Sequence, residues 1–159
     1  MNSSNYLAHR LNEVLLEGRW IANTNFREQI ELTTRDEAVR KIGALNSVAA
    51  LTYHINYYLE GILNVFHGGT LEIRDKYSFD MPPIDASADW QNLIDRFTAN
   101  AHEFTTCVEK MSGDRLNSVF VDEKYGSFSR NIEGVIEHSY YHLGQVVLIR
   151  KLIAGRASE

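Results

Sequence analysis

Four stretches of the chain repeat apolar residues at intervals of three and four positions, the pattern of a helix with one buried face. They predict helices over about residues 4–22, 45–67, 87–111 and 127–154. Glycines follow the second and third of these stretches, where a helix commonly stops. With no strand pattern of comparable length, the fold class is predicted to be all-α.

The three connections differ in character. Residues 23–43 carry scattered Asn and Thr and predict short helical turns, with Thr34 as an N-cap. Residues 68–86 show no helical period. Residues 113–126 contain alternating valines and a Tyr-Gly turn, which predict a short hairpin.

Four helices in a chain of 159 residues predict a single domain, 1–159, built as a four-helix bundle. The 68–86 connection is far longer than antiparallel neighbours need. It could run the length of the bundle at about 3.3 Å per extended residue. The second and third helices would then be parallel, in an up-down-down-up order. The connection could equally be a lid over a site, and the two interpretations are compatible.

Composition excludes several classes of protein. The net charge is −5 and the basic residues are dispersed, so we expect no nucleic-acid partner. No apolar run reaches the length of a membrane span and the N-terminus lacks the apolar region of a secretory signal, so we expect no membrane association. Cys107 is the single cysteine, which rules out an intrachain disulfide and suits a cytoplasmic protein.

Two histidines occupy an unexpected place in the last helix. At about 100° per residue, His138 and His142 lie within 40° of each other on a face shared with apolar residues. The charged residues of this helix, among them Glu137 and Lys151, lie on the opposite side. The pair is therefore predicted to point inward.

His54 has the same setting in the second helix, on the face of Leu51 and Ile62. One inward histidine is usually a satisfied core residue, but three are harder to explain, because a buried imidazole without a partner costs about 1–3 kcal/mol. Spacing of i and i+4 brings two ring nitrogens within reach of one ion. Neutral imidazole is a ligand for zinc, nickel or iron. We therefore predict a metal site at His54, His138 and His142, with open positions for water or substrate.

Other polar residues could complete this site. The pocket candidates on the same helix faces are Tyr58, Tyr141 and Gln145. None of them is a good base at neutral pH. A carboxylate from the 68–86 connection could reach the site instead: Asp75, Asp80 or Asp85. The catalytic residue is left open by the sequence.

At these positions the sequence resembles the DinB-like (DinB/YfiT) superfamily. The signature of that family is a histidine on the second helix and an H-x-x-x-H pair on the fourth, often followed by Gly-Gln. His54, His138, His142 and Gly144-Gln145 match it. The resemblance spans nearly the whole chain. It implies an up-down-down-up four-helix bundle, a bound divalent metal (zinc or nickel) and a homodimer.

A homodimer also has support in the residues themselves. The last helix carries a second apolar arc, made of Ile132, Ile136, Leu143 and Val147. A helix this apolar is buried on two sides. A dimer interface would explain the arc, and so would packing beneath residues 23–43.

The resemblance implies less about activity. Characterised relatives include thiol-dependent transferases and isomerases that act with bacillithiol or mycothiol. A site of three imidazoles could instead activate water for hydrolysis. We therefore expect a metal-dependent hydrolase or a thiol-dependent transferase acting on a small molecule, with a low-molecular-weight thiol as a candidate cofactor. The alternative is a non-catalytic metal-binding or interaction bundle.

Overall fold

The computed structural model describes residues 3–156, whose regular secondary structure is helical apart from one isolated bridge. The helices are α1 (Ser3–Leu15), α2 (Phe26–Glu31), α3 (Arg35–Val39), α4 (Val48–Phe66), α5 (Ser87–Glu109), α6 (Gly113–Asn117) and α7 (Phe128–Arg156). Two 3-10 turns are formed by Asp75–Tyr77 and Glu123–Tyr125. The predicted all-α fold class is confirmed.

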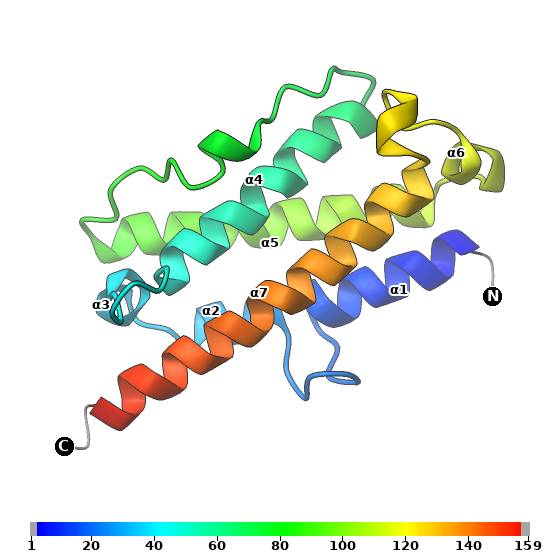
Figure 1. Ribbon diagram of the computed structural model, residues 1–159. Coiled ribbons are helices and arrows are strands. Elements are labelled where there is room, and N and C mark those ends of the chain that lie inside the picture. The colour runs from blue at the N-terminus through cyan, green and yellow to red at the C-terminus, as the bar shows by residue number, and fades with distance from the viewer. Residues whose placement is uncertain (1–2, 157–159) are drawn as a thin grey trace.

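The four long helices form one bundle in which α1 and α4 each contact both α5 and α7. In Figure 1, α4 and α5 run in the same direction, whereas α1 and α7 run in the opposite one. The chain between α4 and α5 returns along the bundle beside α4. This return is what the length of the 68–86 connection led us to expect.

The core lies where the apolar faces of the four long helices meet. Its largest fully buried side chains include Leu11 of α1, Leu51 of α4 and Phe97 of α5. Phe97 stacks on Phe26 of α2 with ring centroids 5.1 Å apart. Full burial of such a side chain contributes roughly 1.5–3 kcal/mol. The same core includes residues of α7, which packs directly on α4, and the candidate site lies between these two helices.

The short helices α2 and α3 are the predicted turns of residues 23–43, and side chains fix where they begin. Asn25 Oδ1 accepts a hydrogen bond from Glu28 N at 2.9 Å. Thr34 caps α3 as expected, and Glu37 bonds back to the Thr34 N–H at 2.8 Å, which completes a capping box. Each cap is worth about 1 kcal/mol.

The first helix is shorter than its pattern predicts, because α1 ends at Leu15 and not near residue 22. The backbone N–H groups of Leu16 and Glu17 both bond to Asn12 O, at 3.0 and 2.9 Å, which closes the last turn. Gly18 then passes so close to Glu13 that a Cβ there would overlap its backbone. The chain can therefore leave the helix axis at this glycine.

The predicted hairpin at residues 113–126 is largely wrong. Residues 113–117 form α6, whose first turn is capped by the Ser112 hydroxyl. Only one bridge pair remains, between Val119 and Ser127, because a 3-10 turn occupies the intervening segment. Gly126, at φ 73°, reverses the chain into α7.

The second apolar arc of α7 is buried within the chain itself. Ile132, Ile136 and Leu143 are at most 1% exposed, Val147 is half-buried against the same core, and α7 contacts both α1 and α2. Intrachain packing therefore accounts for the arc, so it no longer argues for a dimer interface. The homodimer stays a prediction.

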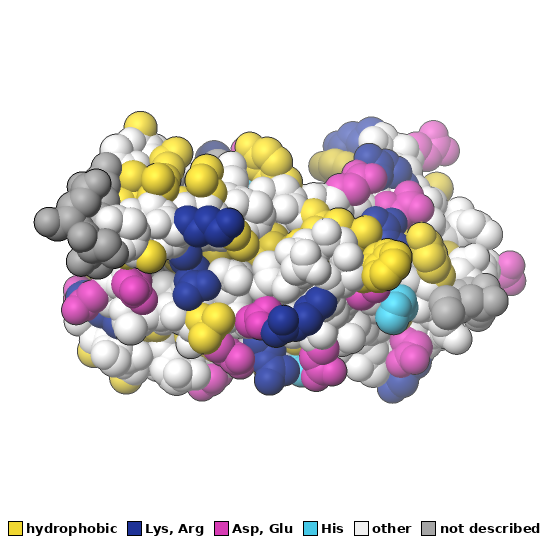
Figure 2. Space-filling view, turned by 90° about the horizontal axis from the view of Figure 1, so that it is seen from below, with side chains coloured by type: hydrophobic (Ala, Val, Ile, Leu, Met, Phe, Trp, Pro, Cys, Tyr) yellow, Lys and Arg dark blue, Asp and Glu magenta, His cyan; other side chains and the backbone are white. Residues whose placement is uncertain are grey.

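The surface seen from below the bundle carries acidic and basic side chains interspersed with apolar ones (Figure 2). No helix among residues 3–156 is long and apolar enough to cross a membrane.

Candidate metal centre

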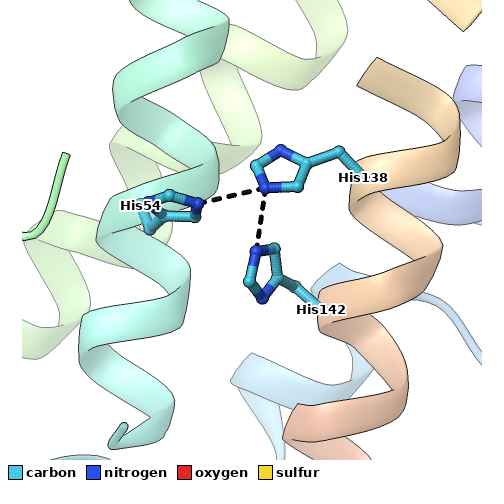
Figure 3. A group of neighbouring side chains, drawn as sticks. All are labelled: His54, His138 and His142. Carbon is cyan, nitrogen blue, oxygen red and sulfur yellow. Dashed lines mark hydrogen bonds between the residues drawn. The ribbon is translucent and has the colours of Figure 1, made fainter. Parts of the chain in front are cut away.

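Three imidazoles meet between α4 and α7, as Figure 3 shows. His138 Nε2 lies 3.1 Å from His54 Nε2 and 2.8 Å from His142 Nε2. All three rings offer ligand atoms that lie within 4.8 Å of one another. The convergence expected from the sequence is present, with the same nitrogen of each ring turned to a common point.

Helix geometry places these rings. His138 and His142 are one turn apart on α7, so their side chains project in nearly the same direction. His54 comes from the buried face of α4, which packs on α7. His54 and His142 are 4% and 6% exposed, and His138 is half-buried. One ring of the cluster is therefore open toward solvent.

Hydrogen bonding alone does not satisfy this cluster. His142 Nδ1 donates to Gln145 Oε1 at 2.6 Å, so the neutral His142 ring presents a lone pair at Nε2. His138 Nε2 faces two nitrogens, yet it carries at most one proton and lies in a single ring plane. At least one of the two close nitrogen–nitrogen contacts is then not a hydrogen bond. A cation at the common point would accept all three lone pairs, so the residues fit a bound metal.

Burial keeps the rings neutral. Desolvation, followed by the neighbouring His142, lowers the pKa of His54 to about 4. The same two causes, in the same order, lower the pKa of His138 to about 4. Burial also lowers the pKa of His142, against the opposing effect of the hydrogen bond that it donates to Gln145. At neutral pH the three side chains therefore have the protonation state that binds a metal.

The outer nitrogen of His54 is less well supported than that of His142. His54 Nδ1 is buried and makes no hydrogen bond of good geometry, although the backbone of Ser78 approaches it closely enough to oppose the fall in pKa. Hydrogen bonds from a ring N–H weaken steeply when they are misaligned. The backbone of residue 78 is therefore a near neighbour of the ring and not its hydrogen-bond partner.

The 68–86 connection covers the cluster, which supports the lid interpretation. Phe79 stacks on the His54 ring, with centroids 4.1 Å apart and planes 11° from parallel. Phe79 is not among the residues that the sequence predicts for the site. Its signal was slight, because Phe79 is one of several apolar residues spread along this connection.

Of the three loop carboxylates, Asp75 is the one that the structure brings to the site. Its Oδ1 accepts a hydrogen bond from the Tyr58 hydroxyl at 2.7 Å, and its charge raises the pKa of His54 and of His138 against the lowering by burial. Asp85 lies instead at the start of α5, where its backbone N–H bonds to Asp89. No contact of Asp80 with the three histidines is seen within the described residues.

The pocket candidates fall in different places. Tyr58 sits edge-on to the rings of His54 and His138, with centroids 5.1 and 5.4 Å away. Gln145 bonds to His142 from outside the cluster. Tyr141 contacts the His142 ring edge-on at 4.8 Å, but its side chain is 64% exposed. Tyr58 and His138 also line a cavity of about 500 Å³.

Together the fold and the site define a helical-bundle protein with three converging histidines that could hold a metal ion. A family model described as the DinB superfamily matches residues 22–146, a range that includes all three histidines. The chain belongs to the DinB superfamily. Neither the curated proteins nor the solved structures contain a significant match to this chain.

Proposed function

We propose that this chain binds one divalent metal ion, zinc or nickel, and is a metal-dependent hydrolase or thiol-dependent transferase acting on a small molecule. The observation that carries the proposal is the convergence of three Nε2 atoms, from His54, His138 and His142, on one point. Three neutral nitrogen ligands suit both metals and leave positions open for a reactant.

The metal would supply one effect, which is to lower the pKa of a water or small thiol bound to it. The surrounding residues would do the rest. Asp75 would accept the proton that the water or thiol releases. Tyr58 would hold Asp75 in place through the 2.7 Å bond. Burial, with the hydrogen bond to Asp75 as second cause, raises the pKa of Tyr58 to about 12, so its hydroxyl stays a donor at neutral pH.

Metal content is the first test. Protein purified without an affinity tag is expected to carry about one zinc or nickel per chain by elemental analysis. His138→Ala is expected to lower the affinity at least about tenfold, because it removes the central nitrogen of the cluster. His102→Ala is the matched control, since His102 is exposed on α5. A wild-type chain that cannot be loaded with either metal would overturn the proposal.

Activity assays separate the two reactions. An activated ester tests for hydrolysis, and an electrophile with bacillithiol or mycothiol tests for thiol transfer. Activity that needs the thiol identifies a transferase, and activity without it identifies a hydrolase. A metal-loaded chain that is inactive in both would favour the alternative, a non-catalytic metal-binding or interaction bundle.

We also expect a cytoplasmic homodimer, for which light scattering and fractionation are the tests.

A further inference from the structure

The cavity beside His138 has the size of a small-molecule site. Its volume is about 500 Å³, within the usual range of roughly 300–1,000 Å³ for such sites. The apolar part of its wall comes from Ile55 and Ile62 on α4 and Val135 on α7. Because His138 also belongs to the histidine cluster, a molecule in this cavity would reach the candidate metal centre.

The charged side chains of Lys124 and Arg130 give this wall a positive charge. Lys124 and Arg130 line the cavity, and no carboxylate is found among the described residues that do so. This is unexpected in a chain whose net charge is −5. A cavity with cationic groups and no acidic one favours an anion.

Both cations remain available to a ligand. Lys124 Nζ lies 3.5 Å from Asp122, and Arg130 Nη1 lies 3.3 Å from Glu137. The two basic side chains are 65% and 60% exposed, and exposed pairs at such distances contribute little. A ligand anion can therefore share or replace these partners at small cost.

The wall is held in place by α7. Asn131 Nδ2 donates to Tyr125 O and to Ser127 O, both at 2.8 Å, which ties the turn carrying Lys124 to the helix. Gly134 lines the cavity between Arg130 and His138, and a Cβ there would meet nothing within 4 Å. A larger side chain at position 134 would project into space that is now open.

The spacing along α7 sets the distance that a bridging ligand has to span. Arg130, Gly134 and His138 follow one another at intervals of four residues. At 1.5 Å per residue, Arg130 and His138 are about 12 Å apart along the axis. A ligand that bridges the two side chains therefore has to span at most about this distance.

We propose that the cavity binds the substrate as a small organic anion, with a carboxylate or phosphate held by Lys124 and Arg130. Its apolar body lies along the walls from α4 and α7, and its reacting end faces His138. The anion site stands on the cavity alone, whereas its role as a substrate site rests on the proposed function.

Titrations followed by protein NMR test this with probes of one length: hexanoate, hexyl phosphate, hexylamine and hexanol. The two anions are expected to shift the amides of Lys124, Arg130 and Gly134, and to bind at least about tenfold more tightly than the amine or the alcohol. Comparing the two anions distinguishes carboxylate from phosphate. Equal affinity for hexanoate and hexanol, or no shift of these amides by any probe, would overturn the proposal.

Paired variants locate the effect. The double variant Lys124→Gln, Arg130→Gln is expected to lower the affinity for both anions at least about tenfold and to leave the affinity for hexanol unchanged. Lys110→Gln with Lys151→Gln changes the net charge equally at exposed positions outside the cavity. If both double variants weaken the anions alike, a general charge effect explains the binding and the proposal fails.

A second pair tests the cavity itself. Gly134→Leu is expected to lower the affinity for every probe at least about fivefold, because the leucine fills the open space. Gly144→Leu is the control, because Gly144 is exposed on the same helix and outside the cavity. Equal effects of the two leucines would contradict a site at this place.

Titrations with metal-loaded and chelator-treated protein separate this inference from the proposed function. Selective anion binding that persists in a chain unable to hold metal would support the anion site and overturn the proposed function. A metal-loaded chain with no preference for anions would overturn only the inference. An anion preference that vanishes on removal of the metal would assign it to the metal and not to the two cations.

Discussion

His142 Nδ1 donates a 2.6 Å hydrogen bond to Gln145 Oε1 one turn further along α7. This bond fixes the tautomer of His142 and turns its Nε2 lone pair to His138, 2.8 Å away. Such outer partners of ligand histidines commonly matter for metal affinity. The glutamine of the Gly-Gln pair that follows the second histidine thus has a physical role in the site.

Replacing Gln145 is expected to weaken metal binding without removing a ligand. Gln145→Leu keeps similar bulk but leaves His142 Nδ1 unpaired, so the affinity should fall about 10- to 100-fold. Competition with a chromogenic chelator measures it. Gln91→Leu, at an exposed position on α5, is the control. An unchanged affinity in Gln145→Leu would mean that the tautomer is set in another way.

Stability of the metal-free protein is expected to fall as the pH decreases from 6.5 to 4. In this range an unfolded histidine takes up a proton, whereas folded His54 and His138, with pKa values of about 4, do not. The unfolded state therefore binds more protons and gains stability in acid. Urea denaturation at several pH values, with chelator present, measures the slope. His54→Phe should have a shallower slope than the wild type, and parallel slopes would contradict the low pKa.

The stacking of Phe79 on His54 is expected to hold the 68–86 connection over the site. Losing such a stack costs about 0.5–1.5 kcal/mol. Phe79→Ala should therefore raise hydrogen exchange at the Ser78 and Asp80 amides, which are bonded within this segment, by about three- to tenfold. Tyr77→Ala is the control, since Tyr77 is 43% exposed, Phe79 is 42% exposed, and only Phe79 stacks on His54. Equal exchange in both variants would show that the stack does not hold the segment.

The same substitution should have opposite effects at two glycines. A Cβ at Gly61 would overlap the Ile73 side chain, so Gly61→Ala should destabilise the protein by about 1–3 kcal/mol through overpacking. A Cβ at Gly144 meets nothing, so Gly144→Ala should stabilise it by up to about 1 kcal/mol through helix propensity. Thermal and urea unfolding measure both. A stabilised Gly61→Ala would show that the connection does not pack on α4 as described.

Local patterns were sufficient for the long helices and for the histidines. Apolar spacing predicts helices over about residues 87–111 and 127–154, close to the observed bounds Ser87–Glu109 and Phe128–Arg156, because helix periodicity depends on near neighbours. Helical spacing likewise predicts that His138, His142 and His54 lie on the inward faces of their helices. The pattern was wrong at two places. The first helix ends before residue 22, where Gly18 lies close to Glu13. Residues 113–126 begin with a capped helical turn instead of a hairpin.

The sequence by itself determined an all-α chain with three histidines on inward helix faces, because those properties follow from spacing along single helices. Only the tertiary structure decided which loop carboxylate meets the site, that Phe79 covers His54, and that Lys124 and Arg130 share one cavity with His138. These contacts join segments that are distant in the sequence. Their geometry depends on how the helices pack and on the path of the irregular 68–86 connection, which local spacing does not specify.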